Sequence, residues 1–155
     1  MKFHIMHCVP HPKMHGLYGY LEVIQSIEWG LISLGHSVTY GLNSFDEESI
    51  NIVFGAQVLP VSVLDVLPKN TIIYHLEQIR GASKELIRKE AQYFADKFTI
   101  WDYSSSNLST WDILNAKNVK VVPVGYAPVL TRIQKPEAQD IDVLIYGSTG
   151  QKRLE

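Results

Sequence analysis

The sequence has little that would mark a secreted, membrane-bound or nucleic-acid-binding protein. It contains a single cysteine, Cys8, in 155 residues, so a disulfide framework is impossible. The formal net charge is only -2, which gives no overall field that would attract a nucleic acid. No stretch approaches the roughly 20 apolar residues of a membrane-spanning helix, and the apolar run at the N-terminus is too short and too polar for a signal peptide. These absences predict a soluble, cytoplasmic protein.

Motifs for nucleotides and metals are also missing. The loop after the first apolar run lacks the G-x-G-x-x-G dinucleotide fingerprint, and no Walker phosphate loop is present. The six histidines form no Cys/His cluster with zinc spacing. His11 and His15 would share a face only in a helix, which Pro10 and Pro12 disfavour. We therefore expect no metal site and no bound cofactor.

The composition and the hydrophobic pattern of the sequence are those of an ordinary globular domain. The chain is 46% hydrophobic and 19% charged, and its length suits one domain with a real core. Short apolar runs alternate with amphipathic stretches, and the runs lack the in–out alternation of a half-exposed strand. Helices covering both faces of a parallel sheet explain such runs. The pattern predicts a doubly wound α/β fold with a mostly parallel, Rossmann-like sheet, and strands at 3–9, 37–40, 51–56, 71–77, 97–101, 119–122 and 141–146.

Helices are expected between these strands. Apolar residues at spacings of three and four predict a long helix over 17–34, and Gly35 is placed to cap it in a left-handed conformation. A short helix is expected within 60–70, ended by Pro68, a second clear helix opens at Ser83, and another spans 104–115. One of several serines is expected to cap this last helix, and Ser109 with Asp112 has the spacing of a capping box.

The alternation of apolar runs and amphipathic stretches stops near the C-terminal end. Residues 123–140 carry three prolines and no sustained period, which is typical of a linker. We predict a domain over 1–122, an interdomain linker over 123–140, and the first strand and loop of a second domain over 141–155.

Candidate site residues follow from the fold, because ligands of open parallel sheets bind at the carboxyl ends of the strands. After the first strand, His15 is a candidate general base toward an acceptor hydroxyl. Gly16 lies where free N–H groups at the start of a helix favour an anion or a sugar hydroxyl. The alternative is an ordinary histidine in a surface loop.

Polar residues also follow the fourth and fifth strands. Glu77 is well placed to bind sugar hydroxyls, although a salt bridge to Arg80 or a helix cap would explain it equally well. Asp102, Ser104 and Asn107 suit hydrogen bonding to a polyol, although serines before a helix are also ordinary caps.

The last candidate group follows the seventh strand. Backbone amides at Gly147, together with Lys152 and Arg153, could hold a diphosphate.

Four segments carry a resemblance to a known family. YHLEQI, WDYSSSN, VKVVPVGYAP and DIDVLIYGSTGQKR occur in that order from about Thr71 onward, and they resemble GT-B glycosyltransferases of a bacterial, family-one-like group. The resemblance implies two facing dinucleotide-like domains, the first of which holds a carbohydrate or other hydroxyl acceptor. Lys152 and Arg153 would belong to the donor side. They would stabilise the departing diphosphate of a nucleotide-sugar co-substrate without a metal.

The resemblance leaves alternatives open. The helices, nucleotide pocket and acidic donor-binding residues of a second domain have no counterpart in the sequence, so we expect the chain to be part of a catalytic unit and inactive alone. Such a part would expose an apolar patch where the second domain packs. The alternatives are a stand-alone nucleotide- or sugar-binding module and a non-catalytic partner of a complete transferase.

Overall fold

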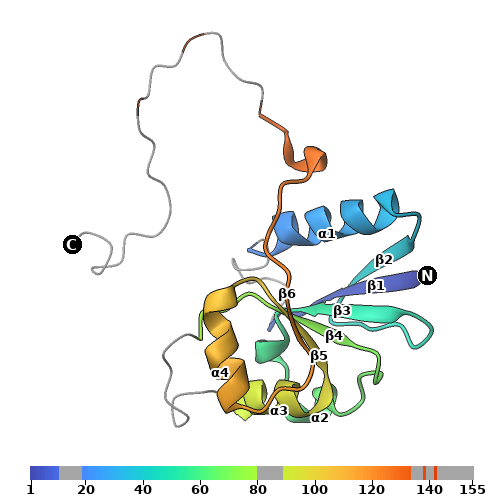
Figure 1. The fold of residues 1–155 in the computed structure, drawn as a ribbon. Helices are drawn as coiled ribbons and strands as arrows, with labels where there is room; N and C mark the ends of the chain where they lie inside the picture. Colours follow the sequence, from blue (N-terminus) through green and yellow to red (C-terminus); the bar gives the residue numbers. More distant parts are fainter. Residues whose placement is uncertain (11–18, 80–88, 134–137, 139–141, 143–155) are drawn as a thin grey trace.

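A six-stranded, all-parallel sheet forms the centre of the molecule (Figure 1). The computed structural model describes residues 1–10, 19–79, 89–133, 138 and 142. Six of the seven predicted strands are confirmed, with ends shifted by a few residues, and the seventh, at 141–146, lies outside the described residues. The strands are β1 (Lys2–His7), β2 (Ser37–Leu42), β3 (Ile50–Phe54), β4 (Ile72–His75), β5 (Thr99–Asp102) and β6 (Val119–Val121).

The strand order confirms a doubly wound, Rossmann-like fold. It runs β2-β1-β3-β4-β5-β6, and every neighbouring pair is parallel. From β1 the chain first crosses to one side, forming β2, and then returns to build β3 to β6 on the other. The direction of winding therefore reverses between β1 and β3, and such a switch point is where a ligand-binding crevice is expected.

Helices cover both faces of the sheet (Figure 1). On one face lies α1 (Leu21–Ser33), and on the other lie α2 (Val61–Leu64), α3 (Lys89–Lys97) and α4 (Leu108–Ile113). Two buried clusters result. One lies between the sheet and α1 and includes Phe3, Ile5 and Ile24, and the other lies between the sheet and the opposite helices and includes Met6, Phe94 and Trp111. Because both faces are covered, β1 is buried along nearly its whole length, which explains its unbroken apolar character.

The end of α1 matches the prediction from sequence. Gly35 has a φ of +80°. Its N–H donates to the Ile32 carbonyl at 2.9 Å, and the His36 N–H donates to the Leu31 carbonyl at 3.0 Å. This pair of bonds is a Schellman motif, which satisfies carbonyls that the last helical turn leaves free.

The start of α4 differs from one prediction. A serine does cap this region, since Ser104 Oγ accepts from the Ser106 N–H at 3.2 Å at the start of the 3-10 turn η3 (Ser105–Asn107). The capping box at Ser109 is wrong, because Ser109 lies inside α4 and Asn107 occupies the N-cap position. The chain has already turned at Ser104, whose own N–H donates to Asp102 Oδ1 at 2.8 Å.

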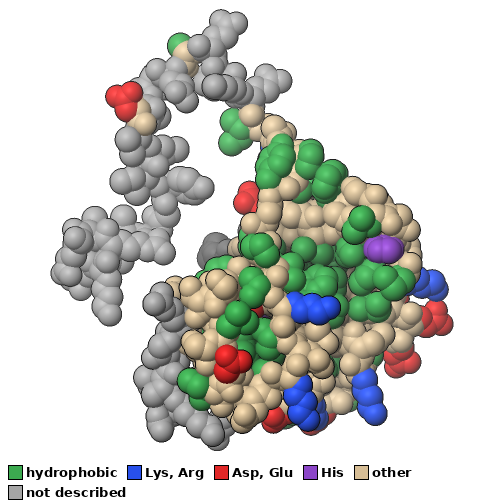
Figure 2. Space-filling view, viewed as in Figure 1, with side chains coloured by type: hydrophobic (Ala, Val, Ile, Leu, Met, Phe, Trp, Pro, Cys, Tyr) green, Lys and Arg blue, Asp and Glu red, His purple; other side chains and the backbone are tan. Residues whose placement is uncertain are grey.

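After β6 the chain passes over to α1 and contacts this helix. Residues 122–127 have no regular structure, and the 3-10 turn η4 (Pro128–Leu130) lies beside α1. Several apolar side chains are exposed there, as Figure 2 shows over η4 and the neighbouring α1. They include Val124, Tyr126 and Val129, with Trp29 and Ile32 of α1. The division into domain, linker and second domain stays a prediction.

A buried threonine without a hydrogen-bond partner gives a test of this fold. Thr71, at the amino end of β4, is 1% exposed, and its hydroxyl has no partner among the described residues. We expect Thr71→Val to raise the free energy of unfolding by about 1 kcal/mol, because it removes an unsatisfied polar group at nearly constant volume. Urea unfolding followed by circular dichroism measures the change.

Thr110 provides the matched control. It is equally buried, but its hydroxyl donates to the Ile79 carbonyl at 2.9 Å. Thr110→Val is therefore expected to lower the free energy of unfolding by about 1 kcal/mol. Equal effects of the two substitutions would contradict this account of Thr71.

Candidate functional site

Three polar side chains meet at the carboxyl edge of the sheet, beside the switch point. Tyr20 immediately precedes α1, Gln57 lies in the 3-10 turn η2 (Ala56–Val58) after β3, and Glu77 follows β4 by two residues. The Tyr20 hydroxyl donates to Glu77 Oε1 at 3.0 Å. Gln57 Nε2 donates to Glu77 Oε1 at 3.0 Å and to the Tyr20 hydroxyl at 2.9 Å. Each residue thus contacts the other two.

This arrangement leaves acceptor atoms for a ligand. Glu77 Oε1 receives both donors, whereas Glu77 Oε2 and Gln57 Oε1 have no hydrogen-bond partner within the described parts of the chain. The Gln57 orientation follows from chemistry, since a carboxylate can only accept and Nε2 must therefore face Glu77. Glu77 is exposed. The site therefore suits ligand groups that donate hydrogen bonds, such as hydroxyls.

Aromatic residues border the three polar side chains. The His7 ring, at the end of β1, lies 5.9 Å from the Tyr20 ring in an edge-on arrangement, and His7 Nδ1 lies 3.1 Å from the Tyr40 hydroxyl. Burial lowers the pKa of His7, so this histidine is neutral at pH 7. Burial likewise raises the pKa of Tyr20. The bond from Gln57 lowers this pKa and the bond and charge of Glu77 raise it, and the net pKa is raised. Among the described residues of this edge, Glu77 thus adds a negative charge beside the neutral His7, Tyr20 and Tyr40 side chains.

Gly55 allows Gln57 to reach this cluster. Gly55 has a φ of +74°, and a Cβ there would lie 2.8 Å from the Cys8 carbonyl oxygen and 3.3 Å from the Tyr20 ring. Both the left-handed conformation and the close approach require glycine. Cys8 itself is inert, because burial raises the pKa of its thiol to about 12.

A second polar cluster is buried behind the edge, around Asp102 at the end of β5. Asp102 is 0% exposed. Its carboxylate accepts from Trp111 Nε1 at 2.7 Å, from Asn107 Nδ2 at 3.0 Å and from the Ser104 N–H at 2.8 Å, and it pairs with His75 Nδ1 at 3.2 Å. Burial alone would raise the pKa of Asp102, but the bonds from His75, Trp111 and Ser104 outweigh it and lower the pKa. Asp102 therefore stays ionised.

Asn107 connects this buried cluster to Glu77. Asn107 is 0% exposed. Besides its bonds to Asp102, it donates to the Glu77 carbonyl at 2.9 Å and accepts from the Ile79 N–H at 3.1 Å. These bonds fix the backbone after β4, and with it the place from which the Glu77 side chain extends.

The predicted site residues are distributed unevenly. Glu77 lies at the edge, Ser104 caps η3, and Asp102 and Asn107 are buried with partners of their own. Their substrate-binding roles stay predictions. The remaining candidates, together with Arg80, lie outside the described residues: His15, Gly16, Gly147, Lys152 and Arg153.

Sequence reasoning missed four residues of these clusters. The spacing of apolar residues includes Tyr20 in the apolar face of the helix predicted over 17–34, and no local pattern marks His75 and Trp111 as partners of Asp102. The signal that identifies Gln57 is its position just after a strand, at the carboxyl edge of the sheet.

No family model, no curated protein and no solved structure matches this chain. Over the described parts of the chain, no three His, Cys, Asp or Glu side chains are grouped so as to hold a metal ion. Within those same parts, no helix has the length and apolar character needed to cross a membrane. The structure shows a Rossmann-like α/β domain that is compatible with nucleotide binding.

The lowered pKa of Asp102 predicts how stability depends on pH. Because the pKa is lower in the folded state than its ordinary value of 3.8, ionised Asp102 stabilises the fold above that value, and the contribution is lost as the pH falls below it. Asp102→Asn removes the charge and places an NH2 group among donors, so we expect a loss of about 3 kcal/mol at pH 7. The loss should shrink in acid. Urea unfolding over a pH series measures it.

Asp112→Asn is the matched control. Asp112 is an exposed carboxylate in α4, next to the Asp102 partner Trp111. We expect it to change the free energy of unfolding by less than about 0.5 kcal/mol. A pH-independent difference between Asp102→Asn and the parent chain would contradict the assignment of a buried charge.

Proposed function

We propose that this chain is the acceptor-binding domain of a nucleotide-sugar-dependent glycosyltransferase, and that acceptor hydroxyls bind at Tyr20, Gln57 and Glu77. One observation carries the proposal: an exposed carboxylate lies beside the switch point, held by two neighbouring side chains, and one of its oxygens has no hydrogen-bond partner among the described residues. Acceptor oxygens at this position suit a sugar hydroxyl.

The charge at the edge favours a neutral ligand over a phosphate. Glu77 repels an anion, and its hydrogen-bond partners Tyr20 and Gln57 are uncharged. The Tyr20 ring offers an apolar surface beside the polar atoms, as carbohydrate recognition requires. Under the glycosyltransferase resemblance, the diphosphate would instead be bound by Lys152 and Arg153 on the donor side.

The division of labour in the proposed enzyme follows from these residues. The acceptor hydroxyl oxygen would form a bond to the anomeric carbon of the donor sugar, whose bond to the diphosphate breaks, and the hydroxyl proton would pass to a base. Glu77 and Gln57 would orient the acceptor, and His15 is the candidate base. A second domain would supply the donor site and cover the exposed apolar side chains beside α1 and η4, among them Tyr126 and Val129.

A stand-alone nucleotide- or sugar-binding module is the second candidate function. The switch point between β1 and β3 favours it, because nucleotides bind at this place in folds of the same winding. Glu77 would then accept hydrogen bonds from a ribose. The two functions differ in whether a phosphate strengthens or weakens binding at the edge.

Nuclear magnetic resonance titration of the 155-residue chain distinguishes them. The probes are a neutral methyl glycoside and uridine diphosphate. The proposal predicts saturable shifts with the glycoside at Tyr20, Gln57 and Glu77, and a Kd raised about tenfold by Glu77→Gln, which removes a charged acceptor. Tighter binding of uridine diphosphate at the same residues would favour the module.

Glu47→Gln is the matched control, because Glu47 is an exposed carboxylate in the β2–β3 connection. It should leave both titrations unchanged. If neither probe shifts the edge residues, or if Glu77→Gln binds the glycoside as the parent chain does, the proposed site is wrong.

A further inference from the structure

A cavity of about 330 Å³ lies at the amino ends of the strands, whereas Glu77 lies at their carboxyl ends. Leu64 and Asp65 line it from α2 and its end, Leu67 and Lys69 from the connection to β4, and Lys97 and Phe98 from the end of α3. It therefore lies at the amino ends of β4 and β5. The length of β4, which has four residues, places the cavity about 13 Å from the carboxyl edge of the sheet.

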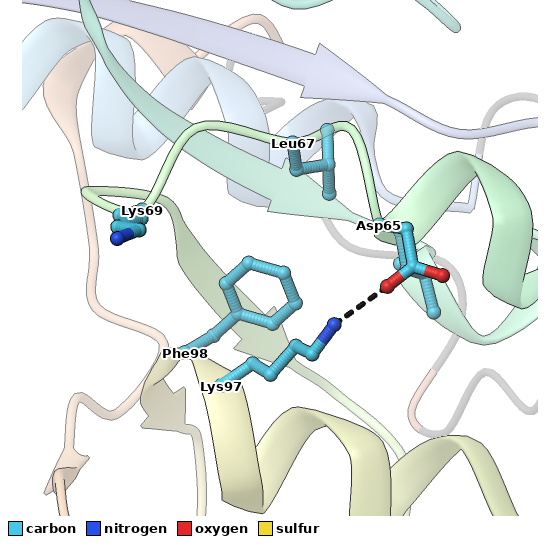
Figure 3. A pocket seen from close by; sticks show the side chains of 6 residues that line it. Asp65, Leu67, Lys69, Lys97 and Phe98 are labelled. Carbon is cyan, nitrogen blue, oxygen red and sulfur yellow. Dashed lines mark hydrogen bonds and ion pairs between the residues drawn. The ribbon is translucent and has the colours of Figure 1, made fainter.

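The cavity combines an apolar floor with a charged rim. Leu64, Leu67 and Phe98 are 1%, 6% and 6% exposed, and all belong to the buried cluster beneath α3. In the view of Figure 3, the Phe98 ring lies between Lys69 and the Lys97–Asp65 pair. Since a water molecule occupies about 30 Å³, the cavity has room for a body the size of an aromatic ring.

Among the described residues, the rim carries one positive charge, on Lys69, that has no ion-pair partner. Lys97 Nζ lies 2.5 Å from Asp65 Oδ1 and 4.3 Å from the centre of the Tyr93 ring. The bonds from Lys97 and Tyr93 lower the pKa of Asp65, and the bond to Asp65 raises the pKa of Lys97, so these two charges are committed to each other. Lys69 has no hydrogen-bond or ion-pair partner among the described residues, which leaves its ammonium for a ligand.

We propose that this cavity is a second binding site, which takes a small carboxylate with a flat apolar body. The apolar body packs on Leu67 and Phe98, and the carboxylate pairs with Lys69. The two lysines against one aspartate favour a single negative charge. The site is independent of the acceptor site at Glu77, because it is formed by other elements at the other end of the strands.

The test uses the whole 155-residue chain and three probes: benzoate, benzyl alcohol and acetate. Methyl resonances of Leu64 and Leu67 and the ring resonances of Phe98 report binding. We expect saturable shifts with benzoate at millimolar concentration, and weaker binding of benzyl alcohol, which lacks the charge, and of acetate, which lacks the ring. Lys69→Gln should raise the Kd for benzoate about threefold, the effect of one exposed charge pair.

Lys120→Gln is the matched control, because Lys120 is an exposed lysine in β6 that does not line the cavity. It should leave benzoate binding unchanged. Absence of saturable shifts at Leu64, Leu67 and Phe98 would overturn the proposal, as would equal binding of benzyl alcohol. Unchanged benzoate binding in Lys69→Gln would overturn it too, whatever the glycoside titration at Glu77 shows.

Discussion

Asp102 places a negative charge in the protein interior at the end of β5, and hydrogen-bond donors around it offset the free energy lost on removing the carboxylate from water. Transfer of an unpaired carboxylate out of water costs several kcal/mol. Asp102 meets a histidine ring, an indole N–H, a carboxamide and a backbone N–H, and each of these donors belongs to an element that must then stay in place. His75 ends β4, Asn107 precedes α4, and Trp111 lies within α4. One carboxylate thus ties two strands and a helix together.

The same carboxylate determines the candidate site indirectly. Asn107 uses its NH2 group for both Asp102 and the Glu77 carbonyl, and its oxygen for the Ile79 N–H. A shift of Asp102 would therefore move the backbone that carries Glu77, although the two carboxylates have different environments. Asp102 is ionised and enclosed, whereas Glu77 is exposed. Polar residues at the ends of neighbouring strands thus divide into a group that fixes the backbone and a group that is available to a ligand.

How far the sequence predicts this structure depends on the range of the interactions. Strand positions and the Gly35 cap follow from local patterns, and both are confirmed. Glu77 was found because a strand precedes it and topology places strand ends at one edge. Tyr20 and Gln57 could not be paired from the sequence, because they are 37 positions apart and their contact depends on β3 lying beside β1. The burial of Asp102 could not be predicted from the sequence for the same reason. Its partners His75 and Trp111 come close to it only when β4, β5 and α4 pack together.

The residues of the carboxyl edge belong to separate connections of the chain. Tyr20 comes from the β1–α1 side of the switch point, and Gln57 and Glu77 come from the strands wound in the other direction. A ligand held by all of them would act as a cross-link between the two halves of the sheet. Backbone pairing of β1 with β3 holds these halves in register, and the existing bonds among the three side chains already order them. Part of the side-chain ordering entropy that binding would otherwise cost has therefore been spent during folding.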